Sequence, residues 1–286
     1  MEHAFAHSAG ERTYKLYVPS QHRAVAQMPL LLMLHGCTQS PDDFAAGTRM
    51  NVLAEQHGFL VAYPAQPANA NGSKCWNWFR PSDQTRAGGE PALLAALALD
   101  IAREYAVDSK RVYVAGLSAG AAMAVILGAT YPDVFAAVGA HSGLPYRAAH
   151  DVPSAFAAMG GRNVAPAPIG DVPARRSGAV TPLIVFQGDR DKTVAPSNAE
   201  TLVKQAIGEA AVLVPERHVS EGAGTGRGYT RSTYTTARGD VLVESWQIHG
   251  AGHAWSGGSA DGTYTDPQGP DASAEMVRFF LQINAT

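Results

Sequence analysis

Apolar residues along this chain gather into short runs, separated by longer stretches of mixed polarity. A continuous apolar run predicts a strand buried on both faces, the kind found in parallel sheets covered by helices. We expect strands at residues 14–19, 29–34, 59–63, 111–115, 134–140, 183–186 and 241–248. We expect helices at residues 41–57, 90–106, 119–130, 199–207 and 272–283. This alternation predicts an α/β fold, with a mostly parallel central sheet and helices on both faces.

Length and composition are those of a soluble globular protein. The chain has 286 residues, of which 46% are hydrophobic and 16% charged, and its formal net charge is −3. A disordered chain would carry fewer apolar residues and more charge, and a nucleic-acid partner calls for a basic face. The apolar runs, such as residues 30–34, fall far short of the ~20 residues that span a membrane. We therefore expect one domain over residues 1–286, with neither nucleic acid nor membrane as partner.

Two stretches, residues 64–89 and 145–180, break the alternation of strands and helices. Both are rich in Pro, Gly, Asn and Ala and show little periodicity. Loops of this length in a compact domain are usually functional. We expect them to form the walls of a pocket, and surface decoration is the alternative.

A G-x-S-x-G sequence centred on Ser118 lies between an expected strand and an Ala-rich helix. A serine on a tight strand-to-helix turn needs very small neighbours, and Gly116 and Gly120 provide them. The serine oxygen then projects from the sheet, close to the positive end of the helix dipole. Ser118 is the candidate nucleophile.

A nucleophilic serine needs a base and a carboxylate. Asp191 follows the strand at 183–186, and His253 follows the strand at 241–248, which gives the order Ser–Asp–His used by α/β-hydrolases. We expect Asp191 to orient His253 and His253 to act as the base. Asp189 is expected to form a turn, and His249, still within the strand pattern, is expected to be structural.

An oxyanion hole requires backbone N–H groups opposite the serine. The turn after residues 29–34 is in the right place, and we expect the N–H of Ala119 to be paired with that of Cys37 or Thr38. His35, just before this turn, is expected to fix the turn by hydrogen bonds rather than to act as a base.

The chain has two cysteines, Cys37 and Cys75. Either they form one disulfide, which would tie an aromatic loop to the oxyanion turn, or they are two unrelated buried thiols. With a disulfide, Trp76, Trp78 and Phe79 become pocket walls for an apolar acyl group, although each could also be an ordinary core aromatic. A disulfide also implies an oxidising compartment.

Taken together, four sequence strings resemble the polyhydroxybutyrate (PHB) depolymerase family of esterases, whose relatives include feruloyl esterases. They are LHGCTQ at 34–39, CWNWF at 75–79, GLSAG at 116–120 and GHAWSGG at 252–258. The resemblance implies an α/β-hydrolase fold and secreted serine esterases that act on short hydroxyalkanoate oligomers or aryl esters. It also implies a triad of Ser118, Asp191 and His253 and, in many members, a bridge between Cys37 and Cys75. Trp255, in the last string, is a further expected pocket residue.

We therefore expect a carboxylic ester hydrolase that works through an acyl-enzyme, with a small-molecule or oligomeric ester as substrate and no metal or organic cofactor. The alternatives are a feruloyl esterase, a peptidase on the same fold, and a non-catalytic binding module. Residues 1–5 carry no signal-peptide pattern, which by itself favours the cytoplasm. The expected disulfide shifts the expectation to a secreted or periplasmic protein whose leader has been removed. Because no adsorption domain follows the catalytic domain, a soluble ester is expected rather than solid polymer. The oligomeric state stays open.

Overall fold

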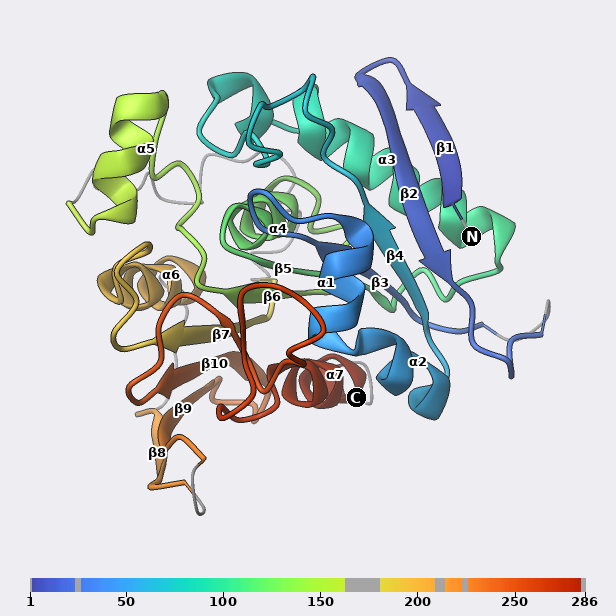
Figure 1. Ribbon diagram of the computed structural model, residues 1–286. Helices are drawn as coiled ribbons and strands as arrows, with labels where there is room; N and C mark the ends of the chain where they lie inside the picture. Colours follow the sequence, from blue (N-terminus) through green and yellow to red (C-terminus); the bar gives the residue numbers. More distant parts are fainter. Residues whose placement is uncertain (1, 24–26, 163–180, 209–213, 223–225, 284–286) are drawn as a thin grey trace.

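The computed structural model describes residues 2–23, 27–162, 181–208, 214–222 and 226–283. Its centre is a ten-stranded sheet with the order β1-β2-β4-β3-β5-β6-β7-β10-β9-β8, and Figure 1 shows this sheet crossing the molecule. The strands are β1 (Glu2–His7), β2 (Gly10–Tyr17), β3 (Leu30–Leu34), β4 (Leu60–Pro64), β5 (Val112–Leu117), β6 (Ala137–His141), β7 (Leu183–Gly188), β8 (Glu216–Ser220), β9 (Tyr229–Thr235) and β10 (Val241–Ile248).

The middle of the sheet is parallel and both edges are antiparallel. Strands β4, β3, β5, β6, β7 and β10 run parallel to their neighbours in this block. The hairpin of β1 and β2 adds to one edge, and β9 and β8 add to the other. A parallel block places the carboxyl ends of its strands at one edge of the sheet, where α/β proteins carry their sites.

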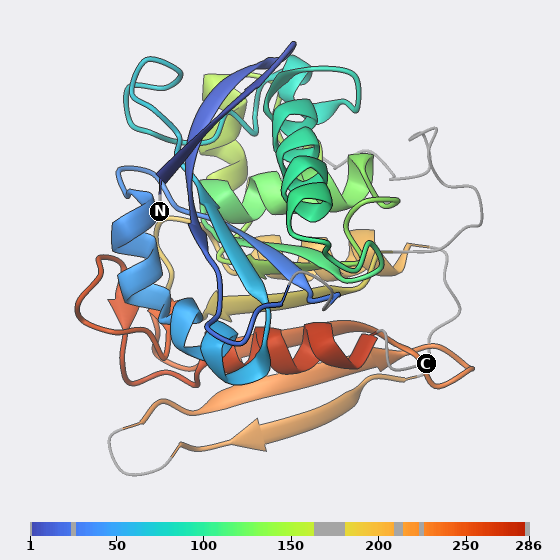
Figure 2. The same ribbon diagram turned by 90° about the vertical axis from the view of Figure 1, so that its right-hand side faces the viewer.

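Helices cover the two faces of the sheet (Figure 2). The first face holds α3 (Gly89–Glu104), α4 (Ala119–Thr130), α5 (Val152–Met159) and α6 (Ser197–Ile207). The second holds α1 (Pro41–Thr48), α2 (Met50–His57) and α7 (Ala272–Ile283). Shorter elements are the 3₁₀ turn η1 (Pro81–Gln84) and the two-residue strands β11 (Trp255–Ser256) and β12 (Thr265–Asp266). The layers confirm the predicted α/β architecture. No helix in the described ranges has both the length and the apolar character to cross a membrane.

Several elements differ from those expected. The helix expected at 41–57 is two helices, because Arg49 between them takes a left-handed conformation with φ 53°. The stretch 145–180, expected to be irregular, contains α5, and its residues 163–180 lie outside the described residues. Strands β8 and β9 were not expected, because their side chains are mostly exposed or half-buried and form no continuous apolar run.

Candidate active site

Ser118 sits on the tight turn between β5 and α4, with φ 58° and ψ −119°. Its N–H donates to the carbonyl oxygen of His141 at 2.9 Å, which holds the turn against β6. A Cβ at Gly120 would collide with the carbonyl oxygen of Leu34, and a Cβ at Gly116 would collide with the backbone of Gly120. The close approach of three backbone segments is thus the physical reason for glycine on both sides of Ser118.

His253 and Asp191 come together from the ends of two neighbouring strands, β10 and β7. The Nδ1 atom of His253 is 2.7 Å from Oδ2 of Asp191, and both side chains are largely buried. The other carboxylate oxygen, Oδ1, accepts the N–H groups of Thr193 and Val194, each at 2.9 Å. The loop that carries Asp191 therefore fixes this carboxylate independently of its contact with the imidazole of His253.

Opposing effects act on the pKa of Asp191. Burial raises the pKa of this carboxyl, but the hydrogen bond and charge of His253, with the N–H groups of Val194 and Thr193, lower it by more. The net result is a pKa below the usual value, so Asp191 is ionised at neutral pH. An ionised carboxylate at Nδ1 keeps the proton on that nitrogen and leaves Nε2 of His253 free to accept one.

Asp189 and His249 have the structural roles that were expected from the sequence. Oδ1 of Asp189 accepts the N–H of Gly250 at 2.7 Å, which fastens the turn after β7 to the segment that leads to His253. Nε2 of His249 lies 3.0 Å from the hydroxyl of Thr230 on β9. Both residues brace the loop behind the candidate triad.

The oxyanion turn follows β3. The N–H of Thr38 donates to the carbonyl oxygen of Ser73 at 2.7 Å, so this N–H is not available to an oxyanion. Among the residues that the structure describes, the N–H groups of Cys37 and Ala119 meet no protein acceptor. The expected oxyanion donors are therefore the backbone N–H groups of Cys37 and Ala119.

His35 holds this turn from beneath. Its Nδ1–H donates to the carbonyl oxygen of Gly36 at 2.8 Å, and its Nε2 accepts the N–H of Gln66 at 3.1 Å. Burial lowers the pKa of His35, which keeps the ring neutral and able to make both contacts. This geometry is that of a structural histidine.

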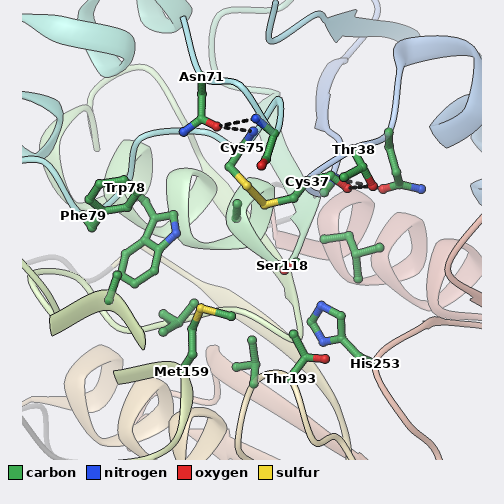
Figure 3. Close-up of a pocket in the computed structure, with 18 of the residues that line it drawn as sticks. Cys37, Thr38, Asn71, Cys75, Trp78, Phe79, Ser118, Met159, Thr193 and His253 are labelled. Atoms are coloured by element: carbon green, nitrogen blue, oxygen red, sulfur yellow. Dashed lines mark hydrogen bonds between the residues drawn. A yellow bond between two sulfur atoms is a disulfide. The ribbon is translucent and has the colours of Figure 1, made fainter. Parts of the chain in front are cut away.

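Ser118 and His253 open into one cavity of about 580 Å³, shown in Figure 3. Its wall includes the Cys37–Cys75 disulfide, which the structure contains. Trp78 and Phe79 line the cavity as expected. The lining residues are Gly36, Cys37, Thr38, Gln39, Asn71, Ser73, Cys75, Trp78, Phe79, Leu117, Ser118, Ala119, Leu144, Val152, Ala155, Phe156, Met159, Thr193, Val194, His253 and Tyr264.

Trp76 and Trp255 were expected in the pocket, and the structure corrects this expectation. Trp76 is fully buried, and its indole N–H donates to the carbonyl oxygen of His35 at 3.1 Å. Trp255 is 1% exposed and stacks on the ring of His141. The indole N–H of Trp255 donates to the hydroxyl of Ser273 at 3.0 Å. Each indole therefore has a buried hydrogen-bond partner within the core, and neither lines the cavity.

Other residues of the site were not expected individually, although the stretch 145–180 was expected to form a pocket wall. The helix α5 supplies Val152, Phe156 and Met159 to the cavity. Asp151 caps this helix by accepting the N–H of Ser154, and this cap could have been recognised in the sequence. Tyr264 belongs to no motif, and only the fold brings it to the cavity.

The sheet order and the placement of the site at the carboxyl ends of its parallel strands define the α/β-hydrolase fold. The structure is similar to that of an acetyl xylan esterase from Aspergillus awamori, with a TM-score of 0.73 over 94% of this chain and 93% of that one. At 21% sequence identity this likeness shows the fold alone.

The sequence identifies the family. The model of the esterase PHB depolymerase family matches residues 12–219. The chain is 36% identical over 275 residues to poly(3-hydroxyalkanoate) depolymerase C of Paucimonas lemoignei, covering 94% of this chain. It is 30% identical over 271 residues to poly(3-hydroxybutyrate) depolymerase of Ralstonia pickettii, covering 88% of this chain. The chain therefore belongs to the PHB depolymerase esterase family. It spans 63% and 53% of the lengths of these two relatives.

Proposed function

We propose that the protein is a serine carboxylic ester hydrolase that cleaves short hydroxyalkanoate oligomers or aryl and short-chain esters. One observation carries the proposal: the His253–Asp191 hydrogen bond of 2.7 Å lies at the same cavity as Ser118 on its strained turn. A nucleophile, a base and an oriented carboxylate at one apolar cavity are the parts that acyl transfer needs.

In the first half of the reaction Oγ of Ser118 attacks the ester carbonyl carbon while Nε2 of His253 takes the hydroxyl proton. The carbonyl oxygen becomes negative and receives the N–H groups of Cys37 and Ala119. The tetrahedral intermediate then expels the alcohol, which leaves with the proton from His253. Throughout, Asp191 holds the ring and stabilises its positive charge.

In the second half water replaces the alcohol. His253 takes a proton from this water as its oxygen attacks the acyl-enzyme carbonyl, and the same N–H groups bind the second oxyanion. The intermediate collapses, the bond to Oγ breaks, and the proton returns from His253 to Ser118. The carboxylic acid is released, and the enzyme regains its starting state.

The substrate class is supported by the relatives and by the cavity. Two relatives are named as a poly(3-hydroxyalkanoate) depolymerase and a poly(3-hydroxybutyrate) depolymerase. Much of the cavity wall is apolar, including Trp78, Phe79, Leu144 and Met159, which suits an alkyl or aryl ester. The disulfide supports a secreted or periplasmic location, because such bonds persist in oxidising compartments.

The test is a hydrolysis panel on the purified protein. It contains p-nitrophenyl esters of increasing chain length, methyl ferulate, hydroxybutyrate oligomers, and amides matched to the esters. We expect ester cleavage by the wild type and a loss of kcat on the order of a millionfold in Ser118→Ala. Ser109→Ala, at an exposed serine between α3 and β5, is the matched control and should keep full activity.

The outcomes separate the alternatives. Turnover of the matched amides that is lost in Ser118→Ala would favour a peptidase. Equal activity of the wild type and Ser118→Ala would disprove the mechanism. Failure of Ser118 to react with a fluorophosphonate probe would favour a non-catalytic binding module.

A further inference from the structure

The cavity around Ser118 has two chemically different halves. One half is mostly apolar and includes Trp78 and Phe79 of the loop at residues 64–89 and Phe156 and Met159 of α5. The other half carries hydroxyl groups, because Oγ1 of Thr38 lies 3.3 Å from the phenolic oxygen of Tyr264. Figure 3 shows Ser118 between the two, with Trp78, Phe79 and Met159 on one side and Thr38 on the other.

His253 lies on the hydroxyl side. Figure 3 shows its ring on the same side of Ser118 as Thr38 and away from Trp78 and Phe79. Backbone contacts agree with this placement, since the N–H of Trp255, two residues after His253, donates to the carbonyl oxygen of Tyr264 at 2.7 Å. The base and the hydroxyl groups therefore share one half of the cavity.

The chemistry of acyl transfer predicts which part of the ester lies in each half of the cavity. The departing alcohol oxygen has to receive its proton from Nε2 of His253, so it must lie on the side of His253. The oxyanion is directed to the N–H groups of Cys37 and Ala119. The remaining substituent of the tetrahedral carbon, the acyl chain, takes the direction away from His253, which is the direction of Trp78 and Phe79.

We propose that the apolar half binds the acyl group and that the half with Thr38 and Tyr264 binds the alcohol; this assignment rests on the proposed esterase function. The preferred substrates are then esters of alkyl or aryl acids with alcohols that carry a further polar group. That group exchanges a hydrogen bond with Tyr264 or Thr38. A hydroxyalkanoate oligomer fits, because its alcohol half bears a carbonyl or carboxylate oxygen.

The apolar half is open to solvent at α5, and we expect this end to set the preference for the length of the acyl chain. The side chains of Val152 and Phe156 line the cavity and are still 52% and 69% exposed. An acyl chain that extends past Phe79 and Met159 would cover these two side chains and remove their apolar surface from water. Longer acyl groups should therefore gain affinity up to the end of α5.

Two ester series test the assignment. The first keeps ethanol as the alcohol and extends the acid from acetate to butyrate and hexanoate. The second keeps butyrate and compares a glyceryl ester with a hexyl ester. For the wild type we expect kcat/KM to rise by about tenfold or more along the first series and to favour the glyceryl ester in the second.

Two variants should separate the halves. Phe79→Ala should reduce the rise in kcat/KM from acetate to hexanoate. It should leave the ratio of kcat/KM for the glyceryl and hexyl esters within about twofold of the wild-type ratio. Tyr264→Phe should lower the glyceryl-to-hexyl ratio by about five- to tenfold, the loss of one hydrogen bond, and leave the acyl series unchanged. Phe156→Ala, at an exposed side chain, repeats the first test if Phe79→Ala does not fold. Leu99→Ala, at a 53% exposed site on α3, is the control.

The opposite pattern would overturn the assignment: Phe79→Ala altering only the alcohol preference, and Tyr264→Phe only the acyl preference. Variants that change neither preference would overturn it as well. A wild type that cleaves no ester, like Ser118→Ala, would instead disprove the proposed function on which the assignment depends.

Discussion

At the scale of single residues, His141 connects the parts of the site without facing the cavity. Its carbonyl oxygen accepts the N–H of Ser118, and its Nε2 accepts the N–H of Ser256 at 3.0 Å. The ring makes stacked contacts with Phe186 and with Trp255. One histidine thus joins the serine turn to the segment that follows His253. No motif pointed to it, because its role depends on three segments far apart in the chain.

Burial makes this histidine a source of acid sensitivity. Burial, followed by the nearby charge of His253, lowers the pKa of His141 from 6.5 to about 3. Between these values the unfolded chain holds a proton on this ring and the folded protein does not. Stability must therefore rise with pH in this window and fall as the pH drops below 6.5, by ~1.4 kcal/mol per pH unit at most.

We expect His141→Gln, whose amide oxygen can accept the Ser256 N–H, to show a shallower dependence of the urea midpoint on pH between 4 and 6.5 than the wild type. His57→Gln, at an exposed site on α2, is the control and should keep the wild-type slope. In the wild type, NMR should show that the His141 ring does not titrate above pH 4. Titration near pH 6.5, or equal slopes for wild type and His141→Gln, would contradict the prediction.

At the scale of elements, the serine turn depends on how closely α4 approaches β3 and β5. The first turn of α4 lies against the carbonyl oxygens of Leu34 and His35, and there is no room for a side chain at Gly120. The glycine spacing predicted that the turn has no room for side chains at these positions, but not that the end of β3 fills the space. The sequence did not predict α5, which walls the cavity, because that helix lies in a stretch with little periodicity.

Gly120→Ala should therefore displace α4 from β3 and disturb both the serine turn and the neighbouring oxyanion turn. We expect a lower free energy of unfolding, by about 1–3 kcal/mol for an overpacked site, and a loss of kcat larger than any change in KM. Gly88→Ala is the matched control, because a Cβ there meets no atom within 4 Å. Chemical denaturation and ester kinetics measure both effects. Wild-type stability and kcat in Gly120→Ala would refute this account.

At the scale of the whole molecule, the long loop after β4 is fastened to the body at two places. The disulfide joins Cys75 to Cys37. The buried carboxylate of Glu90 accepts the backbone N–H and the side-chain amide of Asn77, each at 2.7 Å. Arg12 of the edge hairpin also contacts Glu90 at 3.2 Å. The loop that carries Trp78 and Phe79 is thus tied to the oxyanion turn after β3 and to the edge of the sheet formed by β1 and β2.

The disulfide closes a loop with a sequence separation of 38 residues. Under the chain-entropy model, removing it by Cys37→Ser/Cys75→Ser should cost up to about 4 kcal/mol of unfolding free energy. Activity should fall too, because Cys37 supplies a proposed oxyanion N–H. Reducing agent should shift the wild type toward the double variant and leave the double variant unchanged. A wild type whose unfolding midpoint and kcat do not respond to reduction would contradict this prediction.

The sequence by itself determined the parallel α/β sheet and the order of Ser118, Asp191 and His253 along the chain. It could do so because buried strands need continuous apolar runs and a tight turn needs glycine, and both are local requirements. Only the tertiary structure decided that the N–H of Thr38 is taken by Ser73 and that Trp76 and Trp255 belong to the core. These outcomes depend on which distant groups compete for the same hydrogen bonds and volume, and local sequence does not record that competition.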